Sequence, residues 1–237
     1  MKHFKLTSES KINEFGIKLF RIVCVKECQW VSVGDKGGWV QSEENLSDGA
    51  WIGHEAEVWG NAKVYGNAWV GEYAKVYGNA EVYGSAYVNG KAKIYGNSKV
   101  YGESMIWGKA EVYDNAKVHG DSYLVDNVKI YGDAKVVIIG AGNAKVCGEV
   151  CIDCLPTLED NALIKDDDDY CYFQSFGQYN KKITAFKTDD STVKINHGSF
   201  TGTCDEFVDH VMEICESDKF KKEYIAIMDV IQAKFEK

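Results

Sequence analysis

Two histidines in the middle of the chain are candidates for acid–base chemistry. His54 stands eighteen residues before Glu72. If residues eighteen apart become neighbours in the fold, the Glu72 carboxylate can orient the His54 imidazole for proton transfer. His119 is a second candidate, because it replaces a tyrosine at the end of a regularly spaced series. The alternative for both histidines is an ordinary surface position without a catalytic role.

Four cysteines could ligate a metal, namely Cys147, Cys151, Cys154 and Cys171. They contain a single Cys-x-x-Cys pair, whereas a strong zinc signal requires two such pairs. Buried, reduced thiols are the competing interpretation. The run of four aspartates at residues 166–169 is compatible with a calcium site or with a solvated loop. Neither motif is specific enough to predict a metal, and we expect no cofactor.

These groups are positioned by a repeat that fills the middle of the chain. Every sixth residue from Leu46 to Ile130 is aliphatic, without exception. An alanine or serine stands two places before most of them, and the common unit reads Val-Tyr-Gly-Asn-Ala-x. The aliphatic series is Leu46, Ile52, Val58, Val64, Val70, Val76, Val82, Val88, Ile94, Val100, Ile106, Val112, Val118, Leu124 and Ile130.

A period of six does not fit an α-helix, but it fits a short strand followed by a turn. Side chains alternate between the two sides of a strand, so the small and the aliphatic residue of each unit point inward together. The Gly-Asn pair suits a sharp corner, because both residues tolerate positive φ. A single strand of this length buries too little surface, and coils must therefore stack to close a core.

The repeat resembles the hexapeptide repeat of left-handed parallel β-helix proteins, whose best-known members are trimeric acyltransferases. The resemblance implies that three hexapeptides form one triangular coil of eighteen residues. A closer resemblance runs through residues 5–7, 34–40, 44–47 and 200–207 and so covers nearly the whole chain. It is to uncharacterised bacterial and phage hexapeptide-repeat proteins that are often described as acyltransferases. This second resemblance implies a fold and leaves the function open.

The chain is predicted to be mainly β and to have three parts. Residues 1–39 form an N-terminal β cap, and residues 40–155 form a left-handed parallel β-helix of about five to six triangular coils. The repeat slips at Val136 and fades by about Ile152. Residues 156–237 form a small C-terminal α+β domain, in which antiparallel strands precede two helices.

Both ends of a β-helix expose unpaired strand edges, so both need covering. At the N-terminal end, residues 4–7, 17–25 and 30–33 are expected to be short strands. At the C-terminal end, the first helix is expected to begin near Thr203 or Asp205, either of which could cap it.

Folding the repeat by eighteen sorts the outward residues onto three faces, and one face carries no charge. Its large outward residues would expose more apolar surface than a soluble monomer normally shows. We therefore predict that this face is an interface, first of all with further copies of the chain as a trimer or a dimer. The alternative is that a terminal segment folds back over it. The predicted interface residues are Trp51, Trp69, Tyr87, Met105, Trp107 and Tyr123.

The other two faces each carry a charged column beside an aromatic column. Stacked aromatic rings support neighbouring strands, so much of this tyrosine content is expected to be structural. Their exposed parts also suit binding, because aromatic residues dominate interface energetics. The exposed columns are predicted to be Trp59, Tyr77, Tyr95, Tyr113 and Tyr131 on one face and Tyr65, Tyr83 and Tyr101 on the other.

Composition narrows the classes of function. The formal net charge is −9, so general nucleic-acid binding is not expected. No apolar stretch is long enough to span a membrane, and the N-terminus does not read as a signal peptide. A cytoplasmic location with reduced thiols is the expectation, in the host cytoplasm if the protein is encoded by a phage.

The leading hypothesis is a non-enzymatic, oligomeric β-helix scaffold that binds a macromolecular partner, such as a host protein, or a small ligand. The phage members of the similar group suggest one version, an inhibitor or sponge of a host defence system. The alternative is a hexapeptide-repeat acyltransferase that uses acetyl-CoA. The regular coils contain neither an inserted loop nor a recognisable acyl-CoA element, which favours the scaffold. A third hypothesis is a sugar-binding component that uses the tyrosine columns.

Overall fold

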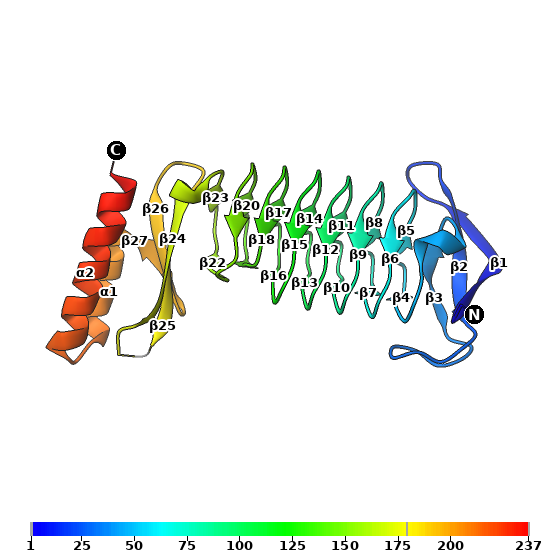
Figure 1. The fold of residues 1–237 in the computed structure, drawn as a ribbon, viewed down its shortest axis with the longest axis horizontal. Coiled ribbons are helices and arrows are strands. Elements are labelled where there is room, and N and C mark those ends of the chain that lie inside the picture. Colours follow the sequence, from blue (N-terminus) through cyan, green and yellow to red (C-terminus); the bar gives the residue numbers. More distant parts are fainter. Residues whose placement is uncertain (1, 179, 237) are drawn as a thin grey trace.

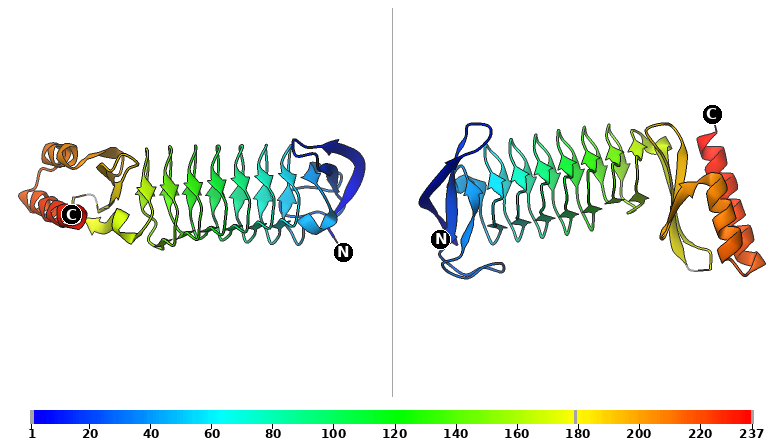
Figure 2. Two further views of the ribbon diagram at one scale, coloured as in Figure 1. Left: turned by 90° about the horizontal axis from the view of Figure 1, so that it is seen from above. Right: turned by 180° about the vertical axis from the view of Figure 1, so that it is seen from behind.

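The protein is an elongated rod built around a parallel β-solenoid (Figure 1). The computed structural model describes residues 2–178 and 180–236. An antiparallel hairpin closes one end of the rod, and an antiparallel sheet with two helices closes the other (Figure 2). The predicted fold class is thereby confirmed: mainly β, with stacked parallel coils and a small C-terminal α+β part.

The N-terminal cap extends one of the solenoid sheets. Strands β1 (Phe4–Ile12), β2 (Lys18–Cys24) and β3 (Lys36–Val40) pair antiparallel, and β3 then pairs parallel with the first coil. The short 3₁₀ helix η1 (Glu43–Asn45) follows β3. The strand expected at residues 30–33 is wrong, because this segment forms a loop between β2 and β3.

Two-residue strands recur along the solenoid and line up in three sheets, which we call faces A, B and C. Face A continues from β3 through β5 (Glu57–Val58), β8 (Lys75–Val76), β11 (Lys93–Ile94), β14 (Glu111–Val112), β17 (Lys129–Ile130), β20 (Lys145–Val146) and β23 (Leu163–Ile164). Face B contains β6 (Lys63–Val64), β9 (Glu81–Val82), β12 (Lys99–Val100), β15 (Lys117–Val118), β18 (Lys135–Val136) and β21 (Cys151–Ile152). Face C contains β4 (Trp51–Ile52), β7 (Trp69–Val70), β10 (Tyr87–Val88), β13 (Met105–Ile106), β16 (Tyr123–Leu124), β19 (Ile139–Gly140) and β22 (Thr157–Leu158).

The solenoid has about seven turns, slightly more than the five to six expected. The stack continues to Ile164, because backbone pairing persists after the side-chain pattern has faded. The slip at Val136 is a shortened side of one coil. There Leu124 pairs with Gly140, sixteen residues later, and the register of eighteen resumes when Gly140 pairs with Leu158.

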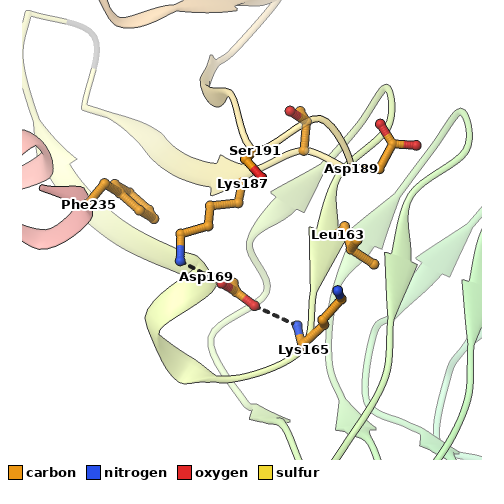
Figure 3. A pocket seen from close by; sticks show the side chains of 8 residues that line it. Leu163, Lys165, Asp169, Lys187, Asp189, Ser191 and Phe235 are labelled. Atoms are coloured by element: carbon orange, nitrogen blue, oxygen red, sulfur yellow. Dashed lines mark hydrogen bonds and ion pairs between the residues drawn. The ribbon is translucent and has the colours of Figure 1, made fainter. Parts of the chain in front are cut away.

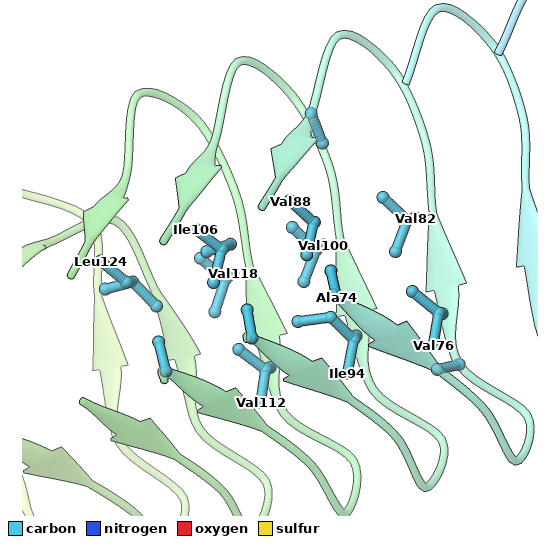
Figure 4. Packing of buried hydrophobic residues seen from close by; sticks show 14 of the residues in the cluster. Ala74, Val76, Val82, Val88, Ile94, Val100, Ile106, Val112, Val118 and Leu124 are labelled. Carbon is cyan, nitrogen blue, oxygen red and sulfur yellow. The ribbon is translucent and has the colours of Figure 1, made fainter. Parts of the chain in front are cut away.

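The interior of the solenoid is a column of packed aliphatic side chains (Figure 4). The repeat's valines, isoleucines and alanines are fully buried there. Where serine replaces alanine, the hydroxyl bonds to a backbone carbonyl, as Ser98 Oγ does to Tyr95 O at 2.7 Å. Burial of these polar groups is therefore compensated by hydrogen bonds.

The corners are tight because successive coils approach each other closely. Gly96 has a φ of +72°, and a Cβ at this position would lie 2.8 Å from the backbone N of Asp114 in the next coil. On the outside of one corner, asparagine amides form a ladder in which each Nδ2 donates to the next side-chain oxygen. This ladder runs through Asn61, Asn79, Asn97, Asn115 and Asp133.

The C-terminal part packs two helices on a four-stranded antiparallel sheet. The strands are β24 (Tyr170–Phe176), β25 (Lys181–Lys187), β26 (Val193–His197) and β27 (Phe200–Thr203), preceded by the 3₁₀ helix η2 (Asp167–Asp169). Helix α1 (Cys204–Ile214) begins at Thr203, whose side chain and that of Glu206 form a capping box. Helix α2 (Asp218–Phe235) buries Tyr224, Ile227, Met228 and Ile231, as expected.

Neither α1 nor α2, nor any other helix within residues 2–178 and 180–236, is long and apolar enough to cross a membrane.

Candidate functional site

Face C carries the predicted interface residues, and the structure stacks them as the spacing requires. Trp51 pairs with Trp69, Trp69 with Tyr87, Tyr87 with Met105, and Met105 with Tyr123 on neighbouring strands. The column continues to Ile139 on β19 without a charged side chain. Apolar and aromatic residues therefore follow one another from β4 to β19.

The N-terminal segment covers the first rungs of this face. Trp51 is buried, and its ring lies 6.0 Å from that of His3, whose Nε2 is 2.8 Å from Ala50 O. The loop between β2 and β3 places Trp30 against Trp69, with ring centroids 5.4 Å apart. The Trp30 indole also donates a hydrogen bond to Asn67 O at 3.2 Å. Trp51 and much of Trp69 are therefore used within the chain and are not available to a second molecule.

The later rungs of face C are open to solvent. Met105 is 48% exposed and Tyr123 is 42% exposed, although both side chains are large and apolar or aromatic. Trp107 is half-buried and stacks on Tyr87 at 5.5 Å. We call the surface formed by Tyr87, Met105, Trp107, Tyr123 and Ile139 the open patch. It contains the predicted interface residues that follow Trp69, together with Ile139, which was not predicted.

Aromatic columns run along faces A and B, and their rings stack on one another. From Trp59 to Tyr131 on face A, the centroids of successive rings are 4.6–5.0 Å apart, with interplanar angles of 1–4°. Tyr65, Tyr83 and Tyr101 on face B are spaced in the same way. Because the ring faces cover each other, only edges and hydroxyls reach solvent. Sugar binding normally uses an open ring face, so these columns are better suited to supporting the coils.

The hydroxyls of Tyr77, Tyr83, Tyr113 and Tyr131 remain protonated at neutral pH. Burial raises the pKa of Tyr77, Tyr83 and Tyr113, and the hydrogen bond with Cys147 together with burial raises the pKa of Tyr131 to about 12. The columns therefore present neutral donors and acceptors beside the charged columns of Lys and Glu.

The His54–Glu72 candidate is not assembled as a catalytic pair. Both residues occupy the same corner on successive coils, with positive φ values of 55° and 52°. The Glu72 carboxylate accepts a hydrogen bond from Asn89 at 3.0 Å, and the exposed His54 ring lies edge-on to Trp69 at 6.1 Å. Among the described residues, no hydrogen bond joins the His54 imidazole to Glu72.

His119 extends the tyrosine column of face B and has a carboxylate beside it. Its ring stacks on Tyr101 at 5.2 Å, and Nε2 lies 3.5 Å from Asp153 Oδ1. Burial, together with the positive charge of Lys135, lowers the pKa of His119. The imidazole is therefore neutral at pH 7, and its contact with Asp153 is not an ion pair at that pH.

The cysteine candidates do not converge on a metal. Cys147 lies beside Tyr131 on face A, the exposed Cys151 follows Val150 on face B, and Cys171 lies on β24. Burial raises the pKa of Cys151 and Cys154, and it raises that of Cys171 to about 11, which disfavours the thiolate that binds a metal. In the part of the chain that the structure describes, no three His, Cys, Asp or Glu side chains are grouped to hold a metal.

The aspartate run forms η2 and is bound internally. Asp169 is buried and accepts hydrogen bonds from the backbone N of Lys165 at 2.8 Å and from Lys187 Nζ at 2.7 Å. The Lys187 ammonium lowers the pKa of Asp169 against the effect of burial. The run's most buried carboxylate is thus neutralised by a lysine rather than left free for a cation.

Sequence reasoning did not find the cavity that lies beside η2 (Figure 3). This cavity of about 400 Å³ lies where the last coil meets the antiparallel sheet, and Lys165, Asp169, Lys187 and Phe235 help to line it. It arises where the two parts of the chain meet, through residues far apart in sequence. Its acidic and basic side chains balance one another, so it has no marked preference for one sign of charge.

Comparison of the sequence with models of protein families and with curated proteins found no match.

Proposed function

We propose that this protein is a non-enzymatic β-solenoid scaffold of the hexapeptide-repeat type, which associates with further copies of itself through the open patch. The observation that carries the proposal is the exposure of Met105 and Tyr123 on neighbouring strands, in a column without charge. Such exposed apolar surface marks interaction sites in soluble proteins.

The N-terminal segment of the chain covers the first strands of the charge-free column on face C. Wherever the N-terminal segment reaches, it covers the apolar side chains with Trp30 and His3. The open patch begins where that cover ends, at Tyr87, which Trp30 meets at a centroid distance of 6.5 Å. The open patch continues a strip of apolar side chains that the chain itself covers. We therefore expect a second molecule to cover the open patch.

A second copy fits the open patch better than a charged partner does. The patch offers no charged side chain for a partner of opposite charge to pair with, whereas an identical patch supplies matching aromatic and aliphatic side chains. A two-fold contact would bury the same residues on both molecules, and a three-fold contact is the arrangement suggested by the acyltransferase resemblance.

Self-association would leave the charged columns of faces A and B pointing outward. These regular rows of Lys, Glu and Tyr edges form open surfaces that are suited to binding a partner. The coils from residue 46 to residue 135 contain no inserted loop that could enclose an active site. The proposal therefore extends to a macromolecular partner held on these outer faces. The resemblance to phage proteins makes a host defence component one such partner.

Replacing Met105 and Tyr123 together by Lys tests the proposal. We expect the wild-type protein to have the mass of a dimer or a trimer of the 26.5 kDa chain. The double variant should have the monomer mass. The reason is that two charges would lose their hydration if the patch were buried, at a cost of several kcal/mol per unpaired charge. The measurement is light scattering coupled to size-exclusion chromatography, at about 100 µM so that weak dimers are seen.

The matched control is Ile12→Lys, since Ile12 is apolar and 72% exposed but lies in the N-terminal hairpin. It should leave the mass unchanged. A monomeric wild-type protein, or a double variant that keeps the oligomer mass, would show that the patch does not join copies of this chain.

A further inference from the structure

A second surface of interest lies at the corner between faces C and A, beneath the turn of the β1–β2 hairpin. A cavity of about 520 Å³ opens there, lined by Glu14, Tyr73, Lys75, Lys91 and Lys93. Glu14 comes from the hairpin turn, and the other four residues come from two successive coils. The hairpin is held in place because Phe15 packs on Trp59 and Tyr77, with ring centroids 5.6 and 5.9 Å away.

The cavity is positively charged in a chain that is negative overall. Three ammonium groups and one carboxylate line it, whereas the net charge of the whole chain is −9. Lys75 and Lys93 are direct neighbours in the parallel register of β8 and β11, an arrangement that costs repulsion energy. Glu14 bonds to Lys75 at 2.8 Å, and the ammonium of Lys75 lowers the pKa of Glu14.

The carboxylate that could neutralise Lys93 from the other side is already engaged. Glu111 stands beside Lys93 in the register of β14, but its Oε2 lies 3.4 Å from Lys129 Nζ and accepts from Tyr95 OH at 3.5 Å. The exposed corner residue Lys91 adds a further positive charge next to Lys93. The cavity therefore favours a bound anion with more than one negative charge.

Tyr73 is the second, independent feature of this cavity. The corresponding corner position is polar in the other regular coils, where it holds Glu55, Lys91, Lys109 and Asn127. Tyr73 is 60% exposed, and among the described residues no other aromatic ring packs against it. Unlike the rings of the stacked columns, it is mostly exposed and lines the cavity beside the lysines. An exposed ring without an aromatic neighbour is suited to stacking with a flat ligand.

We propose that this cavity binds a nucleotide, with the base stacked on Tyr73 and the phosphates held by Lys91 and Lys93. Base–aromatic stacking tolerates any base, because every base has a π face. Lysine ammonium groups bind phosphate as mobile point charges and can follow a flexible diphosphate. A single nucleotide fits better than a nucleic acid strand, since one open ring is present and the acidic remainder of the protein repels a polyanion.

Isothermal titration calorimetry with ADP, GDP, UDP and CDP at low salt tests this site. We expect binding of at least one nucleoside diphosphate, and a loss of affinity of about tenfold in Tyr73→Ala, the amount typical of one stacked base. Lys91→Glu combined with Lys93→Glu should abolish binding. Glu14→Gln should strengthen it severalfold, because Glu14 supplies the one carboxylate among the described residues that line the cavity.

Two controls separate this site from unspecific attraction. Lys117→Glu changes an exposed lysine of face B that also stacks on lysines, Lys99 and Lys135, and should leave the affinity unchanged. Pyrophosphate should bind more weakly than the diphosphates and should be insensitive to Tyr73→Ala. Circular dichroism verifies that each variant folds.

The proposal is overturned if none of the four nucleotides binds the folded wild-type protein at millimolar concentration. It is equally overturned if Lys117→Glu weakens binding as much as the changes at Lys91 and Lys93. Tighter binding of a short single-stranded oligonucleotide than of any mononucleotide would assign the surface to nucleic acid instead.

Discussion

Replacing Ile106 by Ala should lower the free energy of unfolding by about 2–5 kcal/mol, the range observed for removing a large aliphatic side chain from a core. Ile106 is fully buried in the middle coil and stacks between Val88 and Leu124. Its neighbours belong to a rigid ladder of strands, so they cannot move inward to fill the cavity. Urea unfolding followed by circular dichroism measures the change.

The matched control is Lys117→Ala, less than one turn further along the solenoid, because Lys117 is exposed on the outside of β15. This change should alter the stability by less than about 0.5 kcal/mol. Because each coil contacts only its neighbours, the Ile106 variant should also lose hydrogen-exchange protection first in β10, β13 and β16. Equal effects of the two substitutions would mean that the aliphatic column is not the source of stability.

Acidification should unfold the C-terminal α+β part through His197 before it affects the solenoid. His197 is buried on β26, its Nε2 lies 3.1 Å from Tyr224 OH, and its Nδ1 has no hydrogen-bond partner. Burial, with the positive charges of Lys181 and His210 nearby, lowers the pKa of His197 to about 4. The unfolded chain keeps the ordinary value of 6.5, so below that pH the unfolded state binds the proton more readily.

This difference in pKa makes the folded C-terminal part less stable in acid. The free energy of unfolding of this part is highest above pH 6.5 and falls as the pH is lowered. At pH 4 it is about 3 kcal/mol lower than at neutral pH. Helical circular dichroism is the suitable readout, because α1 and α2 are the only α-helices in residues 2–178 and 180–236.

His197→Gln separates this histidine from the carboxylates that also titrate in acid. The glutamine amide can still bond to Tyr224, but it cannot take up a proton in this range. We expect the variant to be less stable at pH 7 and to show a weaker pH dependence between pH 6.5 and 4. His54→Gln, a change at an exposed corner, should behave as the wild type does. An unchanged pH profile in the His197 variant would rule out this explanation.

The solenoid could be predicted from sequence because its physical cause is local and repeated. Aliphatic residues such as Val82 and Val100 face the interior of the solenoid in every coil. The six-residue spacing therefore predicts the burial of all fifteen aliphatic positions. The antiparallel strands and the two helices were predictable for the same reason, since each shows its own periodicity. The extra turns were not, because β22 and β23 are held by backbone pairing while their side chains depart from the repeat.

The candidate site was predicted only in part, because its extent depends on contacts between distant segments. The charge-free column follows from the register, but nothing in the repeat indicates that Trp30 covers Trp69. An isolated tryptophan in a polar loop was the available signal, and residues 30–33 read more readily as a strand. The cavity around Tyr73 was missed because one of its walls, Glu14, comes from a hairpin turn some sixty residues away.

The face assignments, the open patch and the cavity at Tyr73 all depend on residues eighteen apart being stacked directly. Paired cysteines measure this register. Ser85 and Glu103 are exposed at the same corner of successive coils, and Ser85 N bonds to Gly102 O at 2.8 Å. Neighbouring strands lie about 4.8 Å apart, which is within the Cα separation that a disulfide spans. Ser85→Cys with Glu103→Cys should therefore form a disulfide on mild oxidation, identified by peptide mapping so that the native cysteines do not interfere.

Ser85→Cys with Asn97→Cys, twelve residues apart, is the matched pair and should remain unlinked, because these two positions lie at different corners of the solenoid. Linkage of the pair twelve apart, or failure of the pair eighteen apart, would contradict the stacking on which both proposed surfaces depend.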